Sequence, residues 1–180
     1  FLFHMQKKIL AILLSVALLL SIGTLAGCRR GGNVNNTVTV EPFDKDTAVE
    51  LTFTHTMGAK LQEVLNTYIE EFNKIYPNIT ITHQSAGGWS DINGQINTEI
   101  AGGSPPNIAY CYPDHVAMYN IAKSVVVLDS LIDSTIEITR ADGSTETLGL
   151  TAEQKADFIE GYYNEGKEYG DGLMYSMPLS

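Results

Sequence analysis

The chain has 180 residues, and its 11 Lys and Arg residues against 21 Asp and Glu residues give a formal net charge of −10 at pH 7. An acidic chain repels the phosphate backbone, so nucleic acid is excluded as an expected partner. The two cysteines, Cys28 and Cys111, provide neither a disulfide framework nor a CxxC pair. Cys111 lies in an apolar run and is expected to be a buried small hydrophobe, with a reactive thiol as the alternative.

The N-terminal segment has the pattern of a secretion signal. Residues 5–28 (MQKKILAILLSVALLLSIGTLAGC) carry two positive charges near their start, Lys7 and Lys8. An apolar core follows, and the segment ends in small residues before Cys28. The alternative is an uncleaved membrane anchor, which requires about 20 mostly apolar residues, whereas this run is diluted at its end by serine, glycine and threonine. Phe1–His4 are interpreted as upstream read-through.

The next part of the chain alternates between strand and helix patterns. Residues 29–47 are rich in Gly, Asn and Thr and predict a flexible tether. Residues 50–57 alternate larger side chains with threonines, which predicts a strand. Residues 60–76 place apolar side chains on one side at helical spacing, and Pro77 ends this amphipathic helix. Residues 79–83 predict a second strand.

A second helix and a third strand continue the alternation. Residues 91–101 predict a helix, with Ser90 as its candidate N-cap. Residues 107–112 predict an apolar strand, and residues 114–123 a short helix. This order predicts an α/β fold with a mainly parallel sheet and helices on both faces. Ligands of such sheets bind beyond the carboxyl ends of the strands.

The remaining residues predict a hairpin, a helix and a last strand. Residues 136–148 hold two polar alternating runs around Asp142 and Gly143, which is a strong signal for a two-residue hairpin turn. Residues 151–154 (TAEQ) match a capping box, which opens a helix. Residues 173–179 predict the last strand.

Three segments, in order, resemble family 1 extracellular solute-binding lipoproteins of bacterial ABC importers, of the sugar and glycerol-phosphate type. They are LTFTHTMGAKLQEVLNTYIEEFNKIYPNITIT at 51–82, GGWSDINGQINTEIAGGSPPNIAY at 87–110 and GDGLMYSMPLS at 170–180. The hairpin at 136–148 fits the family pattern less well and is interpreted as an insertion.

The resemblance implies a periplasmic-binding-protein-like fold, in which two α/β lobes close on a solute by hinge motion. Residues 1–28 are then a signal peptide, 29–47 a tether, and 48–180 an incomplete N-terminal solute-binding lobe of a truncated chain. It also implies a receptor, expected to be a monomer without cofactor. This receptor would deliver an oligosaccharide, or a sugar- or glycerol-phosphate-like solute, to ABC permease subunits.

The ending Leu25-Ala26-Gly27-Cys28 resembles the lipobox of bacterial lipoproteins. The resemblance implies cleavage before Cys28 and a diacylglycerol on its sulfur. One acyl chain alone binds membranes marginally, and stable anchoring takes two or more signals, which a diacylglycerol meets. We therefore expect a protein that is lipid-anchored on the extracytoplasmic face of the bacterial cell membrane.

Four candidate ligand residues follow the second and third strands. Trp89 is the only tryptophan, and aromatic faces pack against the apolar faces of sugars. Its alternative role is to hold its own loop in place. Ser90 adjoins it and offers a hydroxyl. Tyr112 and Asp114 follow the third strand, where Asp114 either accepts sugar hydroxyls or caps the next helix.

Three further candidates lie at other chain positions. His55 and Met57 flank the end of the first strand, and His55 either hydrogen-bonds the solute or packs against the sheet. Ser180 lies where the resemblance places small polar ligand contacts, with no role as the alternative. The histidines show no metal-ligand spacing, and no catalytic motif is found. Two alternatives stay open: a secreted carbohydrate-active enzyme with catalytic carboxylates beyond Ser180, and a surface adhesion lipoprotein.

Overall fold

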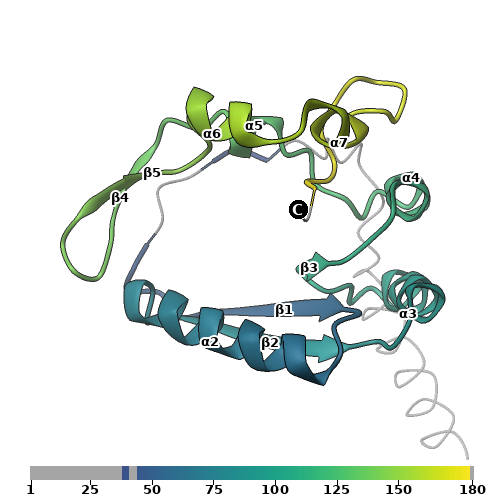
Figure 1. The fold of residues 1–180 in the computed structure, drawn as a ribbon, viewed down its shortest axis with the longest axis horizontal. Helices are drawn as coiled ribbons and strands as arrows, with labels where there is room; N and C mark the ends of the chain where they lie inside the picture. The colour runs from purple at the N-terminus through teal and green to yellow at the C-terminus, as the bar shows by residue number, and fades with distance from the viewer. Residues whose placement is uncertain (1–37, 41–43, 179–180) are drawn as a thin grey trace, which may run out of the picture. The chain divides into compact units, whose positions relative to one another are not determined.

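The computed structural model describes residues 38–40 and 44–178 (Figure 1). The expected signal peptide with Cys28 as its expected lipidation site, most of the expected tether, and Ser180 lie outside the described residues. Within the described part of the chain, no helix has the length and apolar character needed to cross a membrane.

Three strands form a parallel sheet. β1 (Val49–His55), β2 (Ile79–Ser85) and β3 (Ile108–Ala109) lie in the order β2-β1-β3, and both pairs are parallel (Figure 1). In this register Phe53 is opposite both His83 and Ile108. The structure thus confirms the α/β fold with a parallel sheet and the placement of these three predicted strands in it.

The third strand is shorter than the 107–112 that the sequence predicts. At its start, the backbone amide of Thr52 donates to the side-chain oxygen of Asn107 at 2.9 Å. The side-chain oxygen of Asn107 takes the place of a backbone acceptor. The backbone pairing of β3 with β1 therefore begins only at Ile108. Beyond the strand, the amide of Tyr110 still donates to the carbonyl of Thr54 at 2.9 Å, before the chain turns into the next helix.

The helix α2 (Ala59–Ile75) follows β1 and contacts β2. It ends before Pro77, as the sequence predicts. Part of its apolar side faces solvent. Leu61 and Tyr68 are 59% and 68% exposed, and Val64 is also exposed. Within the described part of the chain, this helix therefore covers the sheet without burying any of its own side chains fully.

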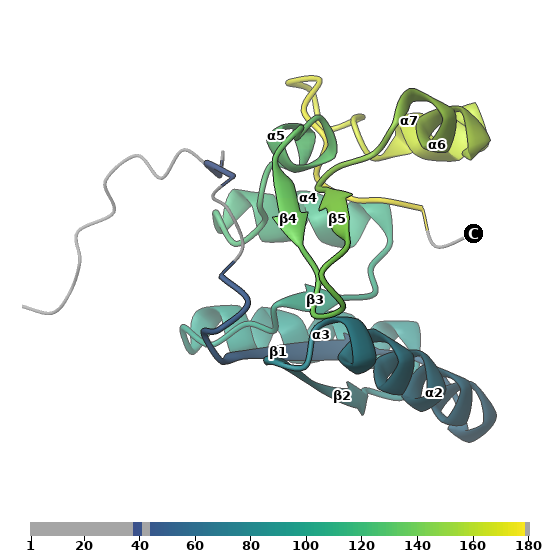
Figure 2. The same ribbon diagram turned by 90° about the vertical axis from the view of Figure 1, so that its left-hand side faces the viewer.

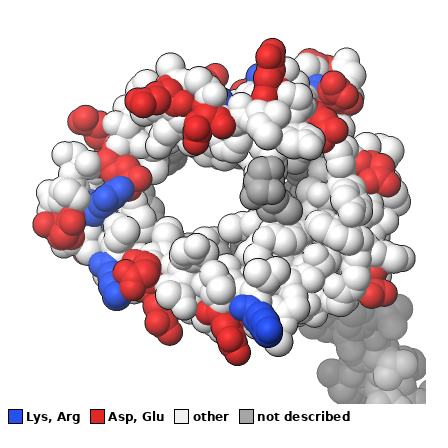
Figure 3. Space-filling model, viewed as in Figure 1, with Lys and Arg blue, Asp and Glu red and all other residues white. Residues whose placement is uncertain are grey.

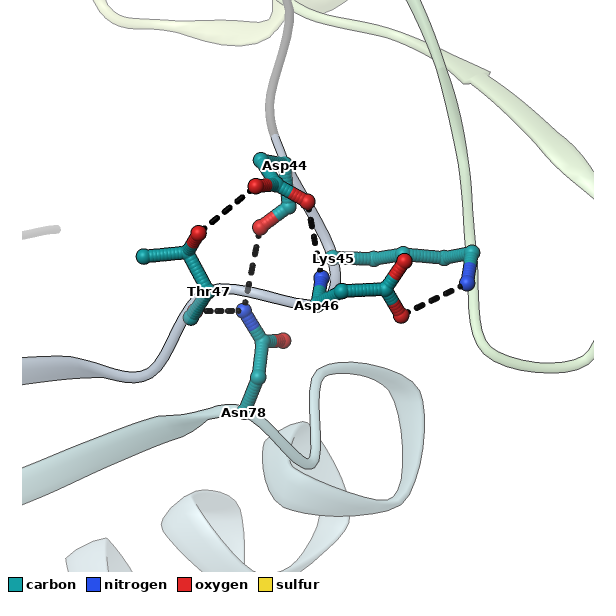
Figure 4. Close-up of polar contacts among 5 residues, drawn as sticks. All are labelled: Asp44, Lys45, Asp46, Thr47 and Asn78. Atoms are coloured by element: carbon teal, nitrogen blue, oxygen red, sulfur yellow. Dashed lines mark hydrogen bonds and ion pairs between the residues drawn. The ribbon is translucent and has the colours of Figure 1, made fainter.

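The residues before β1 are held against the loop that leads into β2 (Figure 4). The side-chain amide of Asn78 donates to the carbonyl oxygens of Thr47 at 2.7 Å and Asp44 at 3.3 Å. The carboxylate of Asp44 accepts from the amide of Asp46 at 3.0 Å and from the hydroxyl of Thr47 at 2.6 Å. The last four residues of the expected tether thus form a hydrogen-bonded turn.

The helix α3 (Trp89–Ala101) begins two residues earlier than predicted. Its N-cap is Gly88, whose amide donates to the carboxylate of Asp91 at 2.8 Å. The prediction of Ser90 as the N-cap is therefore wrong, because the capping carboxylate comes from within the first turn. On the inner side of the helix, Ile92 and Ile96 are buried against Tyr119 of α4 (Pro113–Ile121).

The predicted hairpin is present, with a longer turn than expected (Figure 2). Thr139 pairs with Thr145, so five residues connect the strands where the sequence predicts two. Gly143 has a φ of +84°, which only glycine adopts without strain.

The capping box at Thr151 is confirmed: its hydroxyl accepts from the amide of Gln154 at 3.1 Å. The elements of this part are α5 (Asp129–Ile132), β4 (Glu137–Thr139), β5 (Thr145–Thr147), α6 (Ala152–Asp157) and α7 (Glu160–Glu165).

The last predicted strand is wrong for its described part, because residues 173–178 form no ladder. The carbonyl of Met174 accepts from the amide of Leu128 at 2.7 Å, whereas the amide of Tyr175 donates to the carbonyl of Gly166 at 2.9 Å. Successive residues thus bond to two different segments. Met174 and Tyr175 are buried, which explains why the sequence pattern resembles a core strand.

Candidate functional site

Two of the aromatic residues that the sequence predicts as ligand contacts lie against each other. Trp89 is the first residue of α3, and Tyr112 is the residue immediately before α4. Their rings are stacked, with centroids 4.3 Å apart and an interplanar angle of 30°. Both follow the carboxyl ends of parallel strands of one sheet, which end at the same edge. The topology of the sheet therefore brings them together.

Both rings line an open cleft of about 460 Å³. Its other residues come from the start of α4, from α7 and from the segment just before the end of the described chain. The lining residues are Trp89, Cys111, Tyr112, Pro113, Tyr162, Glu165, Gly166, Ser176, Met177 and Pro178. Apolar and aromatic surface with a few polar groups is typical of small-molecule sites. The cleft can thus hold a ligand with apolar faces and polar edges.

The C-terminal end of α7 is held at this cleft by a close backbone contact. A side chain at Gly166 would have its Cβ 2.2 Å from the carbonyl oxygen of Ser176 and 2.9 Å from the sulfur of Met174. Only glycine fits there. The hydroxyl groups of Tyr169 and Ser176 are hydrogen-bonded at 3.1 Å. These contacts fix the positions of Glu165 and Ser176 at the cleft.

A second cleft, of about 470 Å³, lies beside β3. Its lining is mainly apolar and includes Phe53, Ile96 and Ile108. None of the described residues that line it is charged. Because a site for a polar solute needs convergent polar groups, the cleft at Trp89 is the better candidate for the functional site.

Four other predicted contacts lie outside both clefts: His55, Met57, Ser90 and Asp114. Ser90 is exposed within the first turn of α3. Asp114 is exposed in the first turn of α4, where its negative charge is favourable next to the positive end of the helix dipole. The structure therefore brings Trp89 and Tyr112 together and leaves these four residues apart from them.

His55 is fully buried and belongs to a hydrogen-bonded chain of side chains. The backbone amide of Met57 donates to His55 Nδ1 at 3.1 Å. His55 Nε2 must then carry the proton, which it donates to His83 Nδ1 at 3.0 Å. His83 Nε2 in turn donates to the side-chain oxygen of Asn66 at 2.8 Å. This geometry fits the alternative role of His55, a histidine packed against the sheet.

Two physical effects favour the neutral form of His55. Burial, and then the positive charge that His83 can carry, lower the pKa of His55 below its ordinary value. In the described part of the chain, no group of three or more His, Cys, Asp or Glu side chains is arranged to hold a metal ion. The contacts of the histidine pair favour a structural role in the sheet.

A comparison with known families identifies the family of the chain. The profile of the family described as bacterial extracellular solute-binding protein matches residues 58–180. The chain belongs to this family. The match confirms the family that the three segments resemble, and it includes Trp89, Tyr112 and the whole candidate cleft. No curated protein sequence matches the chain.

Solved structures of solute-binding proteins have the same fold. An extracellular solute-binding protein family 1 member from Alicyclobacillus acidocaldarius shares 25% identity, with a TM-score of 0.53 over 75% of this chain and 29% of that one. The GacH receptor of Streptomyces glaucescens, solved unliganded and with acarbose, shares 15% identity, with a TM-score of 0.55 over 74% and 29%. A periplasmic oligogalacturonide-binding protein from Yersinia enterocolitica, solved with saturated digalacturonic acid, shares 20% identity, with a TM-score of 0.54 over 73% and 28%. This chain thus spans less than a third of the length of these proteins.

Sequence reasoning missed the part of the cleft that comes from α7 and from the segment 176–178. Tyr162 and Glu165 are three residues apart on one helix, so they lie on the same side of it. That spacing was visible in the sequence of this solute-binding protein. It gave no sign that α7 lines the same cleft as Trp89, because that arrangement involves contacts between distant residues, such as the close approach of Ser176 to Gly166.

Cys111 lines this cleft and also the second cleft beside β3. Burial raises the pKa of its thiol to about 11. Cys111 is half-buried. Its raised pKa favours the expected small hydrophobe over the alternative of a reactive thiol, because the thiolate is the reactive form.

We expect Cys111 to react slowly with a thiol reagent in the folded protein. In a Cys28→Ala variant it is the only cysteine of the 180 residues. Its labelling by a disulfide reagent at pH 8 should be about 100-fold slower than that of an ordinary cysteine, because so little thiolate is present. Labelling in urea should be fast. Equal rates in the folded and unfolded protein would contradict the buried thiol.

Proposed function

We propose that the protein is an extracytoplasmic receptor that binds a carbohydrate-type solute and delivers it to ABC permease subunits. The observation that supports this proposal is the stacked pair of Trp89 and Tyr112 at the cleft. Such rings offer their faces to the apolar faces of a sugar, while the hydroxyl of Ser176 and the carboxylate of Glu165 can fix its hydroxyl groups.

The family and its solved members support the same proposal. Members with this fold are described as bound to acarbose and to a digalacturonic acid. By analogy, the described residues form much of one lobe, and binding closes a second lobe over the solute by hinge motion. The protein then acts by binding alone, without covalent chemistry, and the permease recognises the closed form.

Calorimetry on the complete gene product tests this proposal. We expect saturable binding of at least one member of a panel of oligosaccharides and sugar or glycerol phosphates, with no change in the ligand recovered afterwards. Recovery of hydrolysed sugar would favour the alternative of a carbohydrate-active enzyme. The absence of binding to every carbohydrate tested would contradict the proposed receptor.

We also propose that the protein is anchored through a lipid on Cys28, in the lipobox sequence at the end of the signal. A Cys28→Ala variant should move from the membrane fraction to the soluble extracytoplasmic fraction, because the acyl chains that hold it at the bilayer are lost. Incorporation of labelled palmitate into the wild type and not into the variant is the matching readout. Unchanged membrane retention of the variant would show that the anchor lies elsewhere.

A further inference from the structure

One charged side chain stands out in the cleft. Among the described residues that line it, Glu165 is the only one with a charge, and no Lys, Arg or His is present. Its carboxylate forms no ion pair with any described residue. The nearby Lys167 is directed elsewhere, with its Nζ 5.3 Å from the centroid of the Tyr163 ring. The carboxylate is therefore available to a ligand.

The fold holds the backbone at Glu165 in place. Glu165 is the last residue of α7, and the next residue is the tightly packed Gly166. The carbonyl of Gly166 accepts from the amide of Tyr175 at 2.9 Å, which holds the end of the helix against the segment that supplies Ser176. The side chain of Glu165 is exposed, and its anchored backbone keeps the carboxylate within reach of the cleft that it lines. A ligand in the cleft therefore lies close to a negative charge.

The electrostatic surroundings add to the effect of this single charge. The chain as a whole carries a net charge of −10, and Figure 3 shows that acidic side chains outnumber basic ones on the face drawn. Such a surface lowers the local concentration of anions and raises that of cations. A phosphate or carboxylate on the solute would also lose water beside Glu165 without gaining a positive partner among the described residues that line the cleft.

We propose that Glu165 is the residue that selects the solute by charge. The solute is then a sugar that offers hydroxyl groups or a protonated amine to this carboxylate, and sugars with a phosphate or a carboxylate are rejected. This inference rests on the proposed carbohydrate-binding function and narrows it, because the phosphate-bearing solutes suggested by the sequence are excluded.

The experiment compares matched sugars on the complete gene product. Calorimetry gives the affinity for a neutral oligosaccharide, for its uronic acid counterpart and for its amino-sugar counterpart. The wild type should bind the neutral or the amino form at least 10-fold more tightly than the uronic acid form. In a Glu165→Gln variant this preference should fall at least 10-fold, because the repulsive charge is removed while the side chain keeps its size.

Glu168→Gln is the matched control. Glu168 is exposed, lies three residues further along and does not line the cleft, so its loss changes the net charge equally and should leave the preference unchanged. An equal effect of both variants, or tightest binding of an anionic sugar by the wild type, would overturn the role of Glu165 and leave the receptor function intact. If no carbohydrate binds, the proposed function fails, and this inference fails with it.

Discussion

Replacing Trp89 with alanine should weaken solute binding by the complete gene product about 5- to 150-fold. The indole ring lies stacked on Tyr112 and lines the cleft. Its removal takes away the apolar face that we propose for the sugar, and burial of a large apolar side chain contributes about 1–3 kcal/mol. Isothermal titration with the tightest ligand of the carbohydrate panel measures the change.

Two further variants separate a loss of ligand contact from a loss of folding. Trp89 also packs against the buried cluster of Ile92, Ile96 and Tyr119, so alanine will destabilise the lobe to some extent. A Trp89→Phe variant keeps an aromatic face and should retain most of the affinity. Tyr68→Ala removes an exposed ring that lines no cleft and should bind as the wild type does. Wild-type affinity of Trp89→Ala would contradict this site.

The sequence predicts the sheet and its first helices well because their signals are local. Alternation in β1 and the amphipathic pattern of α2 can be read within a few residues, and the strand-helix order implies parallel strands. The same reasoning places Trp89 and Tyr112 near each other, because both follow strand ends. Their direct stacking at 4.3 Å goes beyond that reasoning.

The parts that could not be predicted depend on contacts between distant residues. Glu165 reaches the cleft only because Gly166 allows the backbone of Ser176 to approach. Met174 and Tyr175 resemble a strand because they are buried, yet their partners are two unrelated segments. The shortening of β3 depends on the side chain of Asn107. None of these contacts has a periodic signal in the sequence.

His55 has two possible roles in the sequence analysis, and its contacts in the structure favour one of them. Its position at the end of β1 fits a ligand contact as well as a packed histidine. The structure buries it fully, between the ring of Phe53 at a centroid distance of 5.2 Å and that of His83 at 5.1 Å. Both of its nitrogens already have partners, so a ligand would have to displace one of them.

The buried His55 should make the stability of the protein depend on pH. Its pKa in the folded state is lowered by burial and by His83, whereas in the unfolded chain a histidine titrates near about 6.5. As the pH falls below that value, the unfolded state takes up a proton that the folded state does not. The free energy of unfolding therefore falls with decreasing pH, by at most about 1.4 kcal/mol per pH unit for this one proton.

Urea unfolding at pH 7.5, 6.5 and 5.5 measures this slope, and a His55→Asn variant isolates the contribution of the ring. The asparagine oxygen can accept the amide hydrogen of Met57 in place of Nδ1, but it cannot be protonated. The variant should be less stable at pH 7.5, because its bond to His83 is lost, and its stability should fall less steeply toward pH 5.5.

Phe53→Leu is the control. It disturbs the packing on His55 and removes no titrating group, so it should lower stability at all three pH values and keep the wild-type slope. A His55→Asn slope equal to that of the wild type would show that another group controls the pH dependence.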